Sequence, residues 1–166
     1  MKRVPVLLFV CIFACSIALA HKPGEDMTSI VLGKGKITIH YGTPTLGARS
    51  LDEMIKPGVV WVMGMNNATT IETTVALNFG GKTLAPGKYS IFARPDEKKN
   101  WTLLVSTGTA LRLDPSTVIL ETPLHFMKET ESKDLLKMTL AKEGAGASLT
   151  VAWGTYRLHA SFKAAA

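Results

Sequence analysis

The alternation of apolar and polar side chains between Val59 and Pro95 constrains the fold more than any other feature of the sequence. From Ile71 to Phe79, side chains suited to a buried face occupy every second position, which is the two-residue period of a strand with one buried face. Gly80-Gly81 and Pro86-Gly87 then supply residues that favour turns, and the alternation resumes at Tyr89. This stretch therefore predicts consecutive strands of an antiparallel sheet.

Similar short segments fill most of the remaining sequence. Strands are expected at residues 30–32, 36–41, 101–105, 117–121, 124–128, 135–141, 148–153 and 155–162. The last two would form a hairpin around Gly154, and one helical turn capped by Ser50 is expected to run to Ile55. About eight to ten short strands with hardly any helix predict an all-β fold, an antiparallel β-sandwich with a Greek-key or jelly-roll path.

The same alternation predicts which side chains form the core. These are Ile37, Ile39, Trp61, Ile71, Val75, Leu77, Tyr89, Ile91, Leu103, Leu149, Val151 and Trp153.

Residues 1–20 have the pattern of a secretory signal peptide, with early cations, an apolar run and a small-residue cleavage site ending at Ala20. We expect cleavage there to leave residues 21–166 as a single periplasmic or secreted domain without a transmembrane helix. Lipoprotein anchoring at Cys15 is the alternative. Because Cys11 and Cys15 both lie in the signal, the exported domain would have neither a disulfide nor thiol chemistry.

The charge of the chain argues against nucleic acid as a partner. There are 19 basic and 13 acidic side chains, and loss of Lys2 and Arg3 would lower the formal net charge from +6 to about +4. The basic residues are scattered in singles and pairs, without the basic stripe interleaved with aromatic residues that nucleic-acid binding requires. A solvated surface is the expected role of most of them.

Several short patterns recur in order along the chain: Tyr41-Gly-Thr-Pro44, Gly58-Val-Val-Trp61, Gly64-x-Asn66, Pro86-Gly87-x-Tyr89 and Leu149 to Trp153. Together they resemble the bacterial exported domains of domain-of-unknown-function family 2911. The resemblance implies a β-sandwich whose biochemical role is unassigned. Val62 and Asn67 stand where the family pattern usually has an arginine and a glutamate, so a polar site built on those two charges would be lost here.

The residues favour a non-catalytic binding or interaction module. No nucleophile motif is present, whereas an arginine can bind a carboxylate or phosphate through two hydrogen bonds, and an aromatic ring beside an amide can orient a small polar ligand. The ligand would be a small polar molecule or an envelope protein, with no cofactor required. The expected binding residues are Tyr41, Arg49, Trp61, Asn66 and Thr69. The resemblance implies the first four, because it places them among the recurring positions of the family.

Two alternatives follow from other side chains. Thioethers and imidazoles suit copper, and an envelope copper site would use His21, Met63, Met65, His125 and Met127. In that hypothesis Met63 and Met65 lie on one strand with both thioethers on one face. Trp61 shares that face by alternation, which favours core packing as the other role of the two methionines. A hydrolase would need a site assembled in space from one of the histidines and distant partners. The carboxylates in expected turns, Asp52 among them, are interpreted as solvated.

Overall fold

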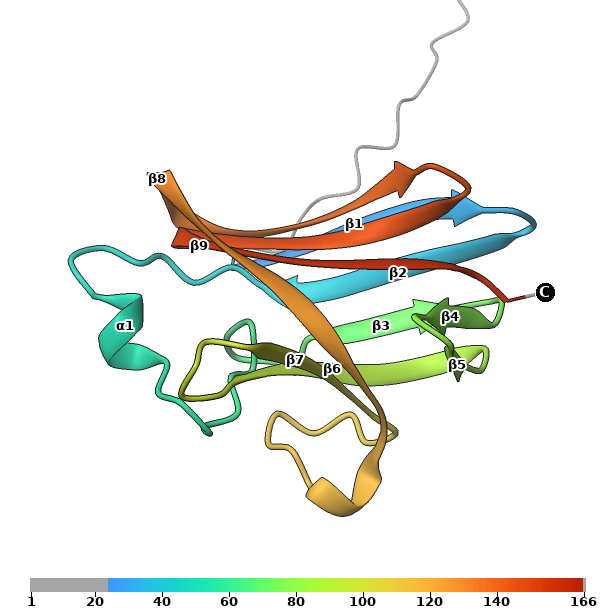
Figure 1. Cartoon of the computed structure of the whole chain (residues 1–166), viewed down its shortest axis with the longest axis horizontal. Helices are drawn as coiled ribbons and strands as arrows, with labels where there is room; N and C mark the ends of the chain where they lie inside the picture. The colour runs from blue at the N-terminus through green and yellow to red at the C-terminus, as the bar shows by residue number, and fades with distance from the viewer. Residues whose placement is uncertain (1–23, 166) are drawn as a thin grey trace, which may run out of the picture.

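The computed structural model describes residues 24–165, which form one antiparallel sheet of nine strands that folds back on itself (Figure 1). The strands are β1 (Glu25–Leu32), β2 (Gly35–Gly42), β3 (Thr70–Thr73), β4 (Leu77–Phe79), β5 (Lys82–Leu84), β6 (Gly87–Pro95), β7 (Trp101–Ser106), β8 (Val118–Glu143) and β9 (Gly146–Ala164). They pair in the order β1-β2-β3-β6-β7-β8-β9-β4-β5. The only helical segments among these residues are single turns, α1 (Leu51–Met54) and the 3-10 turn η1 (Pro115–Thr117). The prediction of an antiparallel all-β fold with hardly any helix is confirmed, and neither helical turn is long enough to cross a membrane.

The long strands β8 and β9 each reverse direction near their middle, at the end of the molecule where α1 lies (Figure 1). A hydrogen bond of 3.3 Å between Thr150 Oγ1 and His159 Nδ1 joins the two halves of β9. The reversal occurs at Gly154, whose φ is +54°, and a Cβ placed there would lie 2.8 Å from a methyl group of Leu51. Glycine is therefore required both by the backbone conformation and by the close packing. The chain reversal expected around Gly154 is present, but it lies within the single strand β9 and does not separate two strands.

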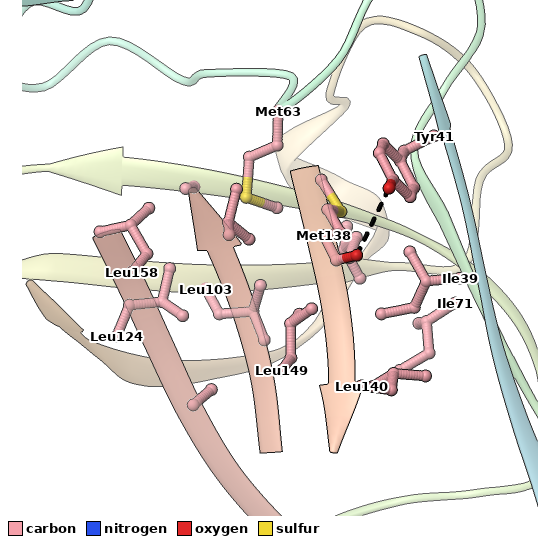
Figure 2. Packing of buried hydrophobic residues seen from close by; sticks show 14 of the residues in the cluster. Ile39, Tyr41, Met63, Ile71, Leu103, Leu124, Met138, Leu140, Leu149 and Leu158 are labelled. Carbon is pink, nitrogen blue, oxygen red and sulfur yellow. Dashed lines mark hydrogen bonds between the residues drawn. The ribbon is translucent and has the colours of Figure 1, made fainter. Parts of the chain in front are cut away.

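These reversals let the single sheet form two layers around one hydrophobic core. Side chains of β2 and β7, including Ile39 and Leu103, face Leu149 on β9 (Figure 2). A hydrogen bond of 3.1 Å from Leu140 N to Thr28 Oγ1 also joins β8 to β1, which are not neighbours in the strand order. Every residue predicted for the core is buried except Trp61, Val75 and Tyr89, which are partly buried against it.

The expected strand through Trp61 is wrong. Trp61 forms an isolated bridge with Ala93, but Met63 and Asn66 have φ values of +52° and +65°, so the chain leaves the extended conformation. Met63 is fully buried while Met65 is 36% exposed, and the two do not share a face. The apolar residues of this segment fill the space beside β6 without forming a regular strand.

The alternation between Ile71 and Phe79 also does not form one strand. β3 ends at Thr73, whose hydroxyl donates to Val75 O over 2.6 Å, and β4 begins at Leu77. β3 pairs with β2 and β6, whereas β4 pairs with β5 and β9. The sequence pattern continues across the break because both strands bury side chains in the same core.

We expect Leu149→Ala to destabilise the domain by about 2–5 kcal/mol, because Leu149 is 1% exposed between the two layers and its removal leaves a cavity. The matched control is Leu135→Ala on β8, where the side chain is 52% exposed, and its effect should be about 0.5 kcal/mol or less. Urea unfolding followed by circular dichroism measures both. Equal losses in the two variants would contradict the assignment of the core.

Candidate functional site

The segment between β2 and β3 covers the end of the sandwich where β8 and β9 reverse (Figure 1). Its turn α1 buries Leu51 and Ile55, which are 5% and 7% exposed, and Leu51 packs on Gly154. The expected Ser50 cap is absent, since its side chain makes no cap hydrogen bond. The Ile55 N–H donates to Leu51 O over 2.8 Å and closes the turn. Burial of these two side chains holds α1 in place, and Asp52 is directed towards β9.

Five aromatic rings gather beneath this turn. Trp61 stacks on Trp153 with centroids 6.0 Å apart and planes within 6°. Trp101 contacts Trp61 edge-to-face at 6.1 Å and Tyr156 at 6.0 Å, and Phe126 contacts Tyr156 at 5.0 Å. Contacts of this kind add stability beyond area burial. The cluster joins the segment before β3 with β7, β8 and β9 in one aromatic wall.

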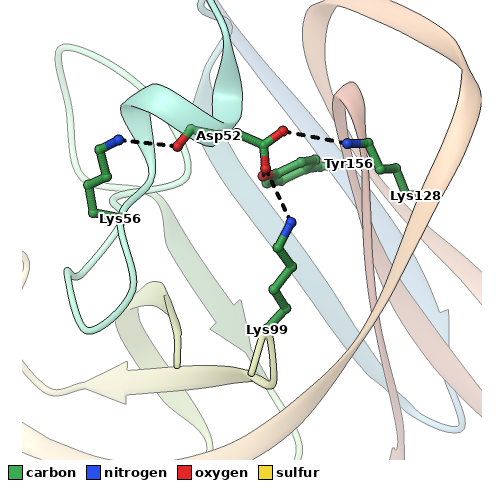
Figure 3. A network of polar contacts seen from close by, with 5 residues as sticks. All are labelled: Asp52, Lys56, Lys99, Lys128 and Tyr156. Atoms are coloured by element: carbon green, nitrogen blue, oxygen red, sulfur yellow. Dashed lines mark hydrogen bonds and ion pairs between the residues drawn. The ribbon is translucent and has the colours of Figure 1, made fainter. Parts of the chain in front are cut away.

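Asp52 is the centre of a polar network beside this wall (Figure 3). The Tyr156 hydroxyl donates to Asp52 Oδ1 over 2.5 Å, and the ammonium groups of Lys99 and Lys128 lie 3.3 Å and 3.5 Å from the carboxylate oxygens. Lys56 Nζ donates to the Asp52 backbone carbonyl at 3.4 Å. The network joins α1 to the loop before β7 and to both long strands.

The protonation states in this network follow from its hydrogen bonds. The Tyr156 hydroxyl, then the Lys99 ammonium, lowers the pKa of Asp52 below its usual value. Burial, reinforced by the neighbouring Asp52 carboxylate, raises the pKa of Tyr156. Asp52 is therefore an anion and Tyr156 a neutral donor at neutral pH. The pair fixes the position of the carboxylate against the lysines.

A cleft of about 250 Å³ lies between α1 and the loop that precedes β7. Its wall is formed by Trp101, Phe126 and Tyr156, and charged side chains stand at its rim. The full lining is Asp52, Ile55, Lys56, Pro57, Pro95, Asp96, Lys99, Trp101, Phe126 and Tyr156. An aromatic wall beside convergent charged groups is the usual composition of a site for a small organic ligand.

The lysines and Asp96 at the rim of the cleft differ in how many further hydrogen bonds they can make to a ligand. Both Asp96 oxygens accept hydrogen bonds of 2.8 Å, from the Lys98 and Asn100 backbone N–H groups and from the Asn100 side-chain amide. An ammonium group has three N–H donors, and within residues 24–165 Lys99 and Lys56 each make one contact of 3.3–3.4 Å. The lysines can therefore accommodate a further anion, whereas Asp96 is already hydrogen-bonded within its own loop.

Two of the expected binding residues have structural contacts. Tyr41 is 3% exposed, and its hydroxyl donates to Asp26 Oδ2 at 3.0 Å and to Met138 O at 3.3 Å. Burial raises its pKa to about 12. Thr69 is fully buried and donates to Met63 O over 3.0 Å, which holds the irregular segment before β3. Neither hydroxyl is directed to the surface.

The other three expected residues are divided between two places. Arg49 donates from Nε to Leu46 O over 3.0 Å and from its terminal nitrogen to Thr45 O, and its guanidinium lies 5.9 Å from the Trp153 ring centre. Trp61 stacks on that same ring, so the structure brings these two predicted residues together. Asn66 is exposed in the irregular segment. The five residues thus do not surround one cavity.

The copper candidates are also divided. Met63 is buried and Met65 exposed, His125 and Met127 lie on the outer face of β8, and His21 lies outside the described residues. Among residues 24–165, no group of three or more His, Cys, Asp or Glu side chains is placed to hold a metal ion. The copper hypothesis therefore gains no convergent ligand set from the described chain.

One serine–histidine–glutamate contact occurs on the outer face of β9. His159 Nε2 lies 3.3 Å from Ser161 Oγ and 3.2 Å from Glu143 Oε2. In a catalytic triad the acid and the nucleophile contact opposite nitrogens of the histidine, and here both contact the same nitrogen, while Thr150 contacts the other. This arrangement is that of a surface hydrogen-bond network, and the hydrolase hypothesis has no further support in it.

The sequence patterns did not identify four residues of this site: Asp52, Lys99, Lys128 and Tyr156. Asp52 and Tyr156 are separated by 104 positions, and no local spacing connects them. The available signals were the placement of Asp52 in the helical turn and the alternation that assigns Tyr156 to a strand beside Phe126. Neither signal indicates that the two side chains meet, because that depends on the reversal of β9.

A family model described as "Protein of unknown function (DUF2911)" matches residues 23–162. The resemblance to this family is thereby confirmed. No curated protein and no solved structure matches the chain.

Loss of the Tyr156 hydroxyl should make the stability of the folded protein less sensitive to acid. The lowered pKa of Asp52 contributes stability above the unfolded value of about 3.9, and this contribution is lost as the pH falls through the lower folded value. Tyr156→Phe removes the strongest hydrogen bond to Asp52. The free energy of unfolding of this variant should therefore fall less between pH 7 and pH 3 than that of the unmodified protein. Urea unfolding at both pH values, with Tyr89→Phe as the hydroxyl-deletion control, measures the difference. An acid sensitivity equal to that of the unmodified protein would contradict the role given to Tyr156.

Proposed function

The chain belongs to the DUF2911 family, whose function is unknown, and from this premise we propose that it is a non-catalytic binding module for a small organic anion with a flat apolar body. The proposed site is the cleft beside α1. The observation that carries the proposal is the aromatic wall of Trp101, Phe126 and Tyr156 next to the ammonium groups of Lys56 and Lys99. The body of the ligand would pack on the rings, and its carboxylate would contact the lysines.

The cleft favours an anionic ligand over a cationic one, because its carboxylates already have partners and its lysines have N–H donors to spare. The Asp52 carboxylate already accepts a hydrogen bond from Tyr156 and contacts two lysines, and Asp96 is held by its own loop. A cationic ligand would have to displace one of these partners. An anion could instead use the remaining N–H donors of Lys56 and Lys99, and Asp52 would keep the Lys99 ammonium beside the wall.

Binding is favoured over catalysis because the cleft offers no activated nucleophile. The neutral Tyr156 and the ionised Asp52 are bound to each other, and the pKa of Tyr156 is raised, which is the opposite of what a tyrosine nucleophile needs. We further propose that the domain acts in the periplasm or outside the cell, on the support of the signal-like pattern of residues 1–20.

We expect phenylacetate to stabilise the protein and phenylethanol, which lacks the carboxylate, to do so much less. A ligand at 100 times its dissociation constant stabilises the folded state by about 2.7 kcal/mol. Lys99→Ala should remove most of this gain, since Lys99 is at the rim of the cleft. Lys98→Ala is the matched control, because Lys98 is the neighbouring lysine and does not line the cleft. Thermal unfolding and calorimetric titration measure these effects.

The proposal fails if neither phenylacetate nor a panel of other aromatic carboxylates shifts the melting temperature. It also fails if Lys98→Ala and Lys99→Ala weaken binding equally, because the effect would then reflect the overall charge of the loop.

A further inference from the structure

A second apolar layer lies on the outer face of the sheet, away from the central core. Ile91 and Ala93 on β6 belong to the core cluster, whereas Phe92 between them points to the opposite side. Phe92 is nevertheless only 1% exposed, and Leu104, its partner on β7, is fully buried. The segment before β3 and the loop between β7 and η1 contribute residues to this face.

A groove of about 400 Å³ remains between these covering segments. Its apolar walls are Val60, Val62, Phe92, Leu111, Leu113 and Pro115. None of these side chains carries a hydrogen-bond donor or acceptor. A ligand inside the groove therefore needs an apolar body that has no polar groups to satisfy.

Arg112 supplies the single charge that lines the groove. Among residues 24–165 its guanidinium makes no hydrogen bond or ion pair, unlike those of the other three arginines in this range. Arg49 binds the carbonyls of its own loop, Arg94 pairs with Glu121 at 3.4 Å, and Arg157 pairs with Glu129 at 3.3 Å. A guanidinium has five N–H donors in a planar arrangement that matches a carboxylate.

We propose that this groove binds an alkyl chain that ends in a carboxylate, such as a medium-chain fatty acid, with the chain on the apolar walls and the carboxylate on Arg112. The Arg112 guanidinium complements the carboxylate of the ligand, and the apolar walls complement its alkyl chain. A peptide would bring backbone amides into walls whose side chains cannot pair with them, at a cost in free energy. The groove lies apart from the cleft beside α1, because the two share no lining residue.

Calorimetric titration with decanoate, below the concentration at which it forms micelles, tests the proposal. We expect binding of one decanoate per protein, with decanol weaker by about ten-fold because it lacks the charge. Arg112→Gln should weaken decanoate to about the level of decanol. Leu111→Asp, at a side chain that is 44% exposed, should abolish binding by placing a carboxylate in the groove. Circular dichroism verifies that both variants are folded.

Two controls locate the binding. Arg157→Gln removes a guanidinium elsewhere on the surface, and Lys99→Ala alters the cleft beside α1, and neither should change the affinity for decanoate. The proposal is overturned if decanoate does not bind, if decanol binds as tightly, or if Arg112→Gln and Leu111→Asp bind like the unmodified protein. It is also overturned if the loss follows Lys99→Ala, since decanoate would then occupy the other cleft.

Discussion

The stacking of Trp61 on Trp153 is the contact on which one end of this protein depends. Trp153 immediately precedes the reversal of β9 at Gly154, and its indole N–H donates to Asp134 O on β8 over 3.1 Å. The Arg49 guanidinium lies near the same ring. One side chain therefore joins two parts of the segment between β2 and β3, at Arg49 and at Trp61, to both long strands. The turn α1 packs on this assembly, and the cleft beside α1 follows from that packing.

The side chains of this assembly give the cleft its chemical character. Its aromatic wall comes from β7, β8 and β9, and its cations come from the segment after α1 and from the loop before β7. The hydrogen bond from Tyr156 to Asp52 has a fixed direction because one partner is neutral and the other ionised. A site held in this way needs little rearrangement to bind a ligand, which reduces the entropy lost on binding. This is the physical reason to expect recognition at this end of the sandwich.

Local sequence patterns were sufficient for much of the fold. The alternation at Ile37 and Ile39 placed both side chains in the core, and Gly154 marked a reversal of the chain because few other residues adopt its backbone conformation. The same pattern failed at Trp61 to Met65, where apolar residues pack in an irregular segment. The contact between Asp52 and Tyr156 was beyond such patterns. It requires the two-layer arrangement of strands that are distant in the sequence, so a carboxylate in a turn gave no sign of its partner.

We propose that a small organic anion binds between α1 and the aromatic wall. The most direct test is a two-dimensional amide NMR titration of the isotopically labelled protein with phenylacetate. We expect chemical-shift changes that saturate and that are concentrated in residues 52–57, 95–101 and 126–128 and at Tyr156, including the indole N–H of Trp101. Saturable changes centred elsewhere, such as around Tyr41 and Thr69, or no changes at millimolar phenylacetate, would contradict the claim.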